Sequence, residues 1–328
     1  MRRQRVAGIG QVGEGDGHSR APCLGLCSQG PYGRDRARVH RRRGDLTEAG
    51  FADALKRDDP DRWMAAQFAP ADVRARLVTL YAFYHEIARV PDAVSEPVIG
   101  EMRLNWAREA VRDLYATPPK VRRHDVYEAL ADLKAAPGAP DSALLDQMVE
   151  ARAADLGQGP FPTRQDRLDY VDRTAGLLMR AAFRLCAPDM TLEGRAADAV
   201  QAAGRFWGLT GLVRAFAPLC AAGRPPLAAD EAAGAGLTES DWLSGRKPDA
   251  ARAALAGLMN EANEAGEALA ASRAALPAQA FAAVGYARLA RGYLRAAGAI
   301  ADPFRERPEP ALLTRQLALS WASLTGRI

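Results

Sequence analysis

Apolar residues recur every three or four positions from about residue 45 onward, which is the spacing of amphipathic α-helices. In the segment that opens at Pro70, one helix face would carry Leu77, Leu80, Tyr81, Tyr84 and Ala88. In the segment that opens at Pro97, one face would carry Ile99, Met102, Trp106 and Ala110. Alternation of apolar and polar residues, the pattern of a strand, is hard to find. The pattern predicts an all-α protein.

Prolines and capping residues mark the expected helix ends. Asp45 or Thr47 can cap a first helix that runs through Leu55. A second helix opens at Pro60, and the helix from Pro70 should run to about residue 90, since Pro91 follows. Later helices are predicted at 124–134, 142–155, 164–186, 192–220, 248–275, 278–301 and 311–324.

Residues 1–44 differ from the rest of this 328-residue chain, since they are rich in Gly and Arg and lack hydrophobic periodicity. This segment contains ten arginines and three acidic residues, Glu14, Asp16 and Asp35, which gives it a net charge of +7. The whole chain carries +4, which leaves −3 for the remainder. We interpret residues 1–44 as a disordered tail or as translation from a misplaced start codon, and residues 45–328 as one helical domain.

Composition excludes several classes of protein. Apolar residues make up 48% and charged residues 26%, values typical of a globular protein. No basic face is evident outside the tail, so no nucleic-acid partner is expected. No uninterrupted apolar run reaches the roughly 18 residues of a spanning helix. The four cysteines, which show no metal-like pairing, are interpreted as reduced and structural in a cytoplasmic protein: Cys23, Cys27, Cys186 and Cys220.

The segment 80–115 carries the first motif. Its Tyr-Ala-Phe at residues 81–83 resembles the aromatic lead-in to the Asp-Asp-x-x-Asp cluster of the squalene/phytoene synthase family. Here the cluster falls on Ala88, Arg89 and Asp92, so one carboxylate of three is kept. In that family the acids hold the Mg²⁺ that activates a diphosphate leaving group.

A second region of resemblance spans residues 203–227. The two aspartates of the family pattern fall there on Ala215 and Leu219. The positions of this region that match the family pattern are Gly204, Arg214, Gly223 and Arg224. Between the two regions, the matching positions are Asp155, Tyr170, Ala175 and Gly176. The resemblance covers about residues 45–325 and implies an isoprenoid-synthase-like helical bundle around a central cavity.

The segment 86–103 resembles the pattern of the respiratory complex I assembly factor group, synthase-like proteins of mitochondria and related bacteria with eroded Asp clusters. The resemblance implies a catalytically degenerate assembly or scaffold factor, with complex I subunits or assembly intermediates as partners and no cofactor. Such a protein would be cytoplasmic, with peripheral contact to the inner membrane left open.

Two alternatives remain open. One is an active Mg²⁺-dependent prenyltransferase that acts on farnesyl or geranylgeranyl diphosphate through Asp92, Asp155 and other acids. The other is a membrane-surface adaptor recruited through the Arg-rich tail.

Six residues are candidates for a residual pocket or anion site: Tyr81, Tyr84, Arg103, Trp106, Arg214 and Arg224. Arginine donates in a fixed fork to phosphate, and an apolar wall suits an isoprenoid or lipid tail. For Trp106 the alternative is an ordinary core residue, and for the arginines a structural ion pair. Three glutamates spaced three apart are interpreted as a solvated stripe: Glu261, Glu264 and Glu267.

Overall fold

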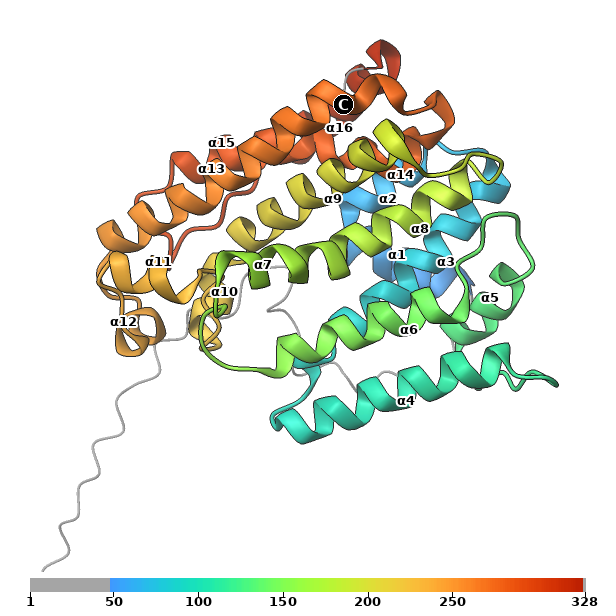
Figure 1. The fold of residues 1–328 in the computed structure, drawn as a ribbon, viewed down its shortest axis with the longest axis horizontal. Coiled ribbons are helices and arrows are strands. Elements are labelled where there is room, and N and C mark those ends of the chain that lie inside the picture. Colours follow the sequence, from blue (N-terminus) through green and yellow to red (C-terminus); the bar gives the residue numbers. More distant parts are fainter. Residues whose placement is uncertain (1–47, 327–328) are drawn as a thin grey trace, which may run out of the picture. The chain divides into compact units, whose positions relative to one another are not determined.

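The structure, a computed structural model, describes residues 48–326 (Figure 1). This part of the chain is all-α, as the periodicity predicts. Within it, β-type pairing is confined to one parallel bridge between Phe161 and Ala228. No helix of this part has the length and apolar content needed to cross a bilayer.

The α-helices, in chain order, are α1 (Glu48–Asp58), α2 (Pro60–Ala66), α3 (Ala71–Ala88), α4 (Pro97–Tyr115), α5 (Asp125–Leu133), α6 (Ser142–Ala151), α7 (Arg164–Val171), α8 (Leu177–Cys186), α9 (Gly194–Arg214), α10 (Phe216–Ala221), α11 (Ala229–Gly234), α12 (Glu239–Ser244), α13 (Pro248–Ser272), α14 (Phe281–Val284), α15 (Ala290–Gly298) and α16 (Leu312–Thr325). Short 3₁₀ segments are η1 (Pro91–Ala93), η2 (Arg152–Leu156), η4 (Arg273–Ala275), η5 (Ala278–Ala280) and η6 (Gly285–Leu289), and one π-helical turn, η3 (Asp172–Gly176), joins α7 to α8.

Prolines open helices where the sequence predicts them. Pro60, Pro97 and Pro248 lie in the first turn of α2, α4 and α13. A proline is tolerated there because its missing N–H would have no intrahelical partner. The expected caps Asp45 and Thr47 lie outside the described residues.

Some predicted helices are divided. The stretch 192–220 breaks at Ala215, because Pro218 cannot donate a hydrogen bond to the carbonyl of residue 214. The stretch 278–301 is divided into η5, α14, η6 and α15. The short helices α11 and α12 were not predicted at all.

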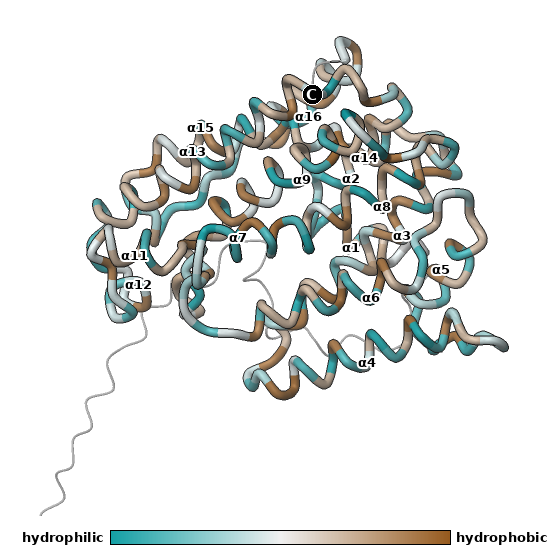
Figure 2. The backbone as a smooth tube through the Cα atoms, viewed as in Figure 1, coloured by the Kyte–Doolittle hydropathy of each residue, from teal (hydrophilic) through white to brown (hydrophobic). Residues whose placement is uncertain are grey.

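Four helices form the centre of the fold. α3, α8, α9 and α13 follow one another in space, each packed against the next, while α4 lies along α6 (Figure 1). Apolar and polar residues alternate by turns along α4 and α6 (Figure 2), and their apolar sides are buried. The apolar face predicted for α4 was wrong, since Ile99, Met102 and Trp106 are exposed and only Ala110 of that face is buried. Apolar residues recur on more than one side of this helix, and packing against α6 buries the side with Leu104, Val111 and Leu114 instead.

A close backbone approach joins α9 to η3. A Cβ on Gly204 would lie only 2.9 Å from the Cα of Gly176. No larger residue fits at this contact without movement of one backbone, so the two family-matching glycines serve to bring the central helices together.

Candidate functional site

An outer polar cluster is formed by residues of η1, η2, α7 and the segment after α10; it comprises Asp92, Arg152, Asp155, Tyr170 and Arg224. Arg152 and Asp155 are three residues apart in η2, and their Nη1 and Oδ2 atoms lie 2.9 Å apart. Tyr170 donates a hydrogen bond of 2.7 Å to the other oxygen of Asp155. The Nη1 atom of Arg224 lies 3.6 Å from the same oxygen. Both oxygens of Asp155 are therefore engaged by partners within the protein.

Arg152 connects this cluster to the interior. Its Nη2 donates to the hydroxyl of Tyr84, and its guanidinium carbon lies 4.6 Å from the centroid of that ring. Burial alone would lower the pKa of Arg152, but the oxygens of Tyr84, Tyr170 and Asp155 outweigh it and raise the pKa. The guanidinium thus stays charged in a nearly buried position.

Asp92 stands at the exposed edge of the same cluster. Desolvation raises the pKa of Asp92, the positive charge of Arg224 opposes that rise, and the negative charge of Asp155 adds to it. The structure therefore brings Asp92 and Asp155, the two residual acids named from the sequence, into one cluster. The positive charge of Arg224 acts on both carboxylates.

An inner cluster surrounds Arg62 of α2. Its guanidinium carbon lies 5.3 Å from the ring centroid of Tyr286, 5.6 Å from that of Tyr84 and 6.0 Å from that of Trp207. Asp59, the cap of α2, accepts a hydrogen bond from the Arg62 side chain and another of 3.3 Å from its backbone N–H. An arginine enclosed by three rings and one carboxylate is a positively charged centre in an aromatic surrounding.

Arg214 links the inner cluster to a third group. Its guanidinium carbon lies 3.9 Å from the ring centroid of Tyr293 and 5.4 Å from that of Trp207. Its Nη1 lies 3.5 Å from Asp61, which also pairs with Arg315. Of the two roles that the sequence left open for Arg214, an anion site or a structural ion pair, the structure shows the ion pair with Asp61.

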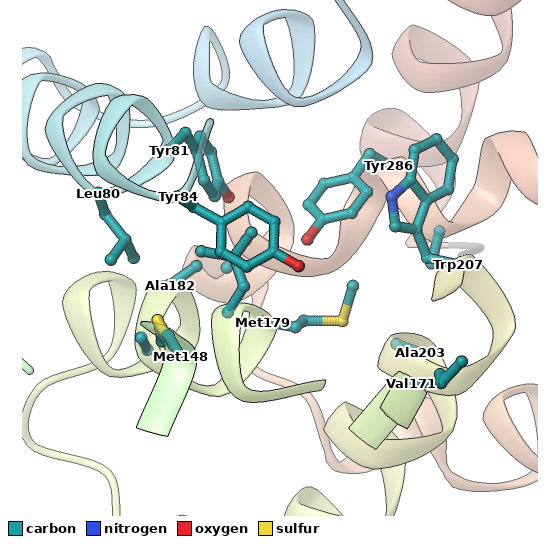
Figure 3. Close-up of a cluster of buried hydrophobic side chains, with 14 of the residues drawn as sticks. Leu80, Tyr81, Tyr84, Met148, Val171, Met179, Ala182, Ala203, Trp207 and Tyr286 are labelled. Carbon is teal, nitrogen blue, oxygen red and sulfur yellow. The ribbon is translucent and has the colours of Figure 1, made fainter. Parts of the chain in front are cut away.

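Apolar side chains line the rest of this interior. Figure 3 shows the hydroxyls of Tyr84 and Tyr286 pointing toward one another, with Met179 below them and Trp207 beside Tyr286. Tyr81 is 1% exposed, and its hydroxyl has no hydrogen-bond partner among the described residues. The remaining labelled lining residues are Leu80, Met148, Val171, Ala182 and Ala203. This is a packed apolar cluster with a polar, cationic side, and the structure shows no cavity among these residues.

Arg103 and Trp106 are not part of this arrangement. Both lie on α4 with exposed side chains, and Trp106 contacts Tyr127 and His124 edge to face rather than the residues of the two clusters. Of the six candidates named from the sequence, the structure brings together Tyr81, Tyr84, Arg214 and Arg224.

Sequence reasoning missed Arg62 and Arg152 because neither was among the residues matched to the family pattern, and a single arginine on a helix is usually exposed. The spacing of Asp59 to Arg62, and of Arg152 to Asp155, was the available signal, since residues three apart share a helix side. The prediction that Glu261, Glu264 and Glu267 form a solvent-exposed stripe was wrong for Glu261. Glu261 is 5% exposed and pairs with the fully buried Arg167.

A model described as squalene/phytoene synthase matches residues 55–320. The chain belongs to the squalene/phytoene synthase family. Two solved structures resemble it, each at 16% identity. A dehydrosqualene synthase in complex with ligand gives a TM-score of 0.71 over 85% of this chain and 95% of that one. The squalene synthase HpnC from Alicyclobacillus acidocaldarius gives 0.61 over 85% and 94%. At this identity the likeness shows the fold alone.

The curated relatives with similar sequences are assembly factor 6 of NADH dehydrogenase (ubiquinone) complex I. The protein of Mus musculus is 24% identical over 136 residues, 38% of this chain and 37% of the relative. That of Homo sapiens is 35% identical over 65 residues, 20% of each. The chain spans less than two fifths of the length of these relatives.

The family implies Mg²⁺, but the donor set does not fit it. Both oxygens of Asp155 already contact Arg152, Tyr170 or Arg224, and the two guanidinium groups beside them would repel a metal cation. Ala215 and Leu219 occupy the second motif. Between residues 48 and 326, no three His, Cys, Asp or Glu side chains are arranged to hold a metal ion.

Proposed function

We propose that this protein is an assembly factor for respiratory complex I whose synthase fold no longer ionises prenyl diphosphates. The observation that carries the proposal is that Asp155, the acid kept at a family-matching position, forms ion pairs with Arg152 and Arg224. Similarity to assembly factor 6 of complex I supports the partner.

The chemistry follows from charge. A diphosphate leaves with negative charge, so a positive group must bind it more strongly in the transition state than in the ground state. Members of the family use Mg²⁺ held by carboxylates for this purpose. Here the carboxylate charge is neutralised by arginine within the fold. The guanidinium groups of this interior are held by hydrogen bonds to partners within the protein, so they are not free to follow a leaving group.

Part of the proposal concerns a ligand. The apolar cluster beside Tyr84 and Met179 would have to open to admit an isoprenoid or lipid tail, and the buried Nε atoms of Arg62 and Arg152 have no hydrogen-bond partner among the described residues. An anionic head group would supply acceptors for these donors. The ligand would then stabilise the fold rather than undergo reaction.

The first test is diphosphate release from farnesyl and geranylgeranyl diphosphate with the full chain and Mg²⁺, beside an active squalene synthase. We expect release at the level of the no-enzyme control. Release within roughly a hundredfold of the active synthase would support the alternative of an active prenyltransferase that uses Asp92 and Asp155.

The second test addresses the partner. A strain that lacks the gene should lose assembled complex I on native gels and NADH:ubiquinone oxidoreductase activity in its membranes. Re-expression of the parent chain should restore both. Normal complex I in the deletion strain would refute the assembly role, whatever the diphosphate assay shows.

A further inference from the structure

The last helix, α16, has an apolar face that no part of the described chain covers. Its inner side is formed by Arg315, Leu319 and Ala322, which are buried. Its outer side carries large apolar residues at helical spacing: Leu313, Leu317, Trp321 and Leu324. Trp321 is 59% exposed and Leu324 is 84% exposed. Apolar residues four and three apart form one stripe along the helix.

The outer side of α16 is also uncharged. The one charged residue between Leu312 and Thr325 is Arg315, and it turns inward to Asp61. Serines, threonines and a glutamine separate the apolar residues of the outer side. Solvent-facing helices of folded proteins usually carry charges on that side, so this face is atypical of a surface that stays in water.

Four arginines on η4, η6 and α15 lie near one another: Arg273, Arg288, Arg291 and Arg295. η6 packs against α16, and a Cβ on Gly292 would lie 3.6 Å from Pro310, just before α16 begins. Burial lowers the pKa of Arg288, and the positive charges of Arg291, Arg273 and Arg295 lower it further. No ion pair in the described part of the chain involves these four arginines. They form a basic patch whose positive charges are not paired with acidic side chains of the described residues.

We propose that α16 and this basic patch bind the surface of a membrane that contains anionic lipids. The stripe that includes Leu317 and Trp321 would enter the boundary between head groups and acyl chains, and the arginines would contact lipid phosphates. Tryptophan suits that boundary because its ring is apolar and its N–H is polar. The uncompensated charge favours this occupant over a neutral protein surface. Glu309, three residues before the helix, does not oppose this binding, because its carboxylate lies 3.8 Å from Arg315.

Flotation of the full chain with vesicles tests the proposal, independently of any role in complex I. Vesicles of phosphatidylcholine with about 30% phosphatidylglycerol should bind the protein roughly tenfold more tightly than phosphatidylcholine alone. The double variant Leu317→Gln/Trp321→Gln should bind the anionic vesicles roughly tenfold more weakly than the parent. Arg291→Gln/Arg295→Gln should lose the preference for anionic vesicles.

The matched control is Met102→Gln/Trp106→Gln, which changes the same kinds of exposed residue on α4 and should bind like the parent. Leu324→Gln, at the exposed end of α16, provides a second and milder variant should the double variant misfold. Parent-like binding by both α16 variants would overturn the proposal and assign any binding to another segment. Equal loss in the α4 control would overturn it as well.

Discussion

Arg315 of α16 donates a hydrogen bond of 2.8 Å to Asp61 of α2, across 254 positions of sequence. Tyr293 completes the group, since its hydroxyl donates to Asp61 at 2.6 Å and accepts from Arg315 at 2.8 Å. Asp61 is 1% exposed and Arg315 7%. The contact joins the last helix to the beginning of the domain in a place that water hardly reaches.

Removal of the Asp61 carboxylate should therefore destabilise the fold. Asp61→Ala leaves the charges of Arg315 and Arg214 without their shared partner, and we expect the free energy of unfolding to fall by about 3–5 kcal/mol. Urea denaturation followed by circular dichroism measures it. The control is Asp72→Ala, which breaks an exposed pair with Arg76 in α3 and should cost less than about 1 kcal/mol. Equal effects of the two substitutions would contradict the argument.

Two glycines of α9 should respond in opposite directions to alanine. At Gly204 the new Cβ meets the backbone of Gly176, so Gly204→Ala should lower the free energy of unfolding by about 1–3 kcal/mol. At Gly211 nothing lies within 4 Å, so Gly211→Ala should be neutral or stabilise by up to about 1 kcal/mol through helix propensity. Chemical denaturation of both variants measures the difference. Stabilisation by Gly204→Ala would show that α9 and η3 are not held this closely.

The buried thiols should be unreactive in the native protein. Burial raises the pKa of Cys186 and of Cys220 to about 12, so the reactive thiolate is scarce at pH 8. Peptide mapping after iodoacetamide treatment should find both residues unmodified without denaturant and modified in urea. Rapid native alkylation of either one would contradict its burial.

The same thiols make stability depend on alkaline pH. Their pKa is raised in the folded state, so their contribution is complete below the unfolded pKa of roughly 8.5 and is lost as pH rises toward 12. Between pH 9 and 10 each thiol should lower the free energy of unfolding by about 1 kcal/mol. Urea titrations at both values measure the slope, and Cys186→Ala/Cys220→Ala should reduce it. An unchanged slope would assign the pH dependence to other groups.

Mg²⁺ should leave the melting temperature unchanged. A ligand that binds only the folded state raises this temperature, and the engaged carboxylate of Asp155 offers Mg²⁺ too few free oxygens. Differential scanning calorimetry with and without millimolar MgCl₂ measures the shift, beside an active synthase with diphosphate ligand as the positive control. A rise of more than about 2 °C would require a metal site that this donor set does not provide.

Helix content and most helix starts were readable from the sequence, because prolines such as Pro97 and the apolar period act locally. The helices α11 and α12 were missed because each has only six residues and depends on tertiary burial of Ala232 or Trp242. Only some of the polar residues in the interior were predicted from the sequence. Arg214 and Arg224 were found through family-matching positions, whereas Arg62 became visible only once the fold placed three rings around it.

The contact of Asp61 with Arg315 also bears on biosynthesis. The carboxylate emerges from the ribosome 254 residues before its guanidinium partner, so the interior cannot be completed until α16 has been translated. A premature stop codon anywhere before α16 would remove that partner and leave Asp61 to be buried without Arg315. Nonsense alleles in the codons just before α16 should therefore yield chains that chaperones and proteases clear, rather than shortened proteins that retain part of their role.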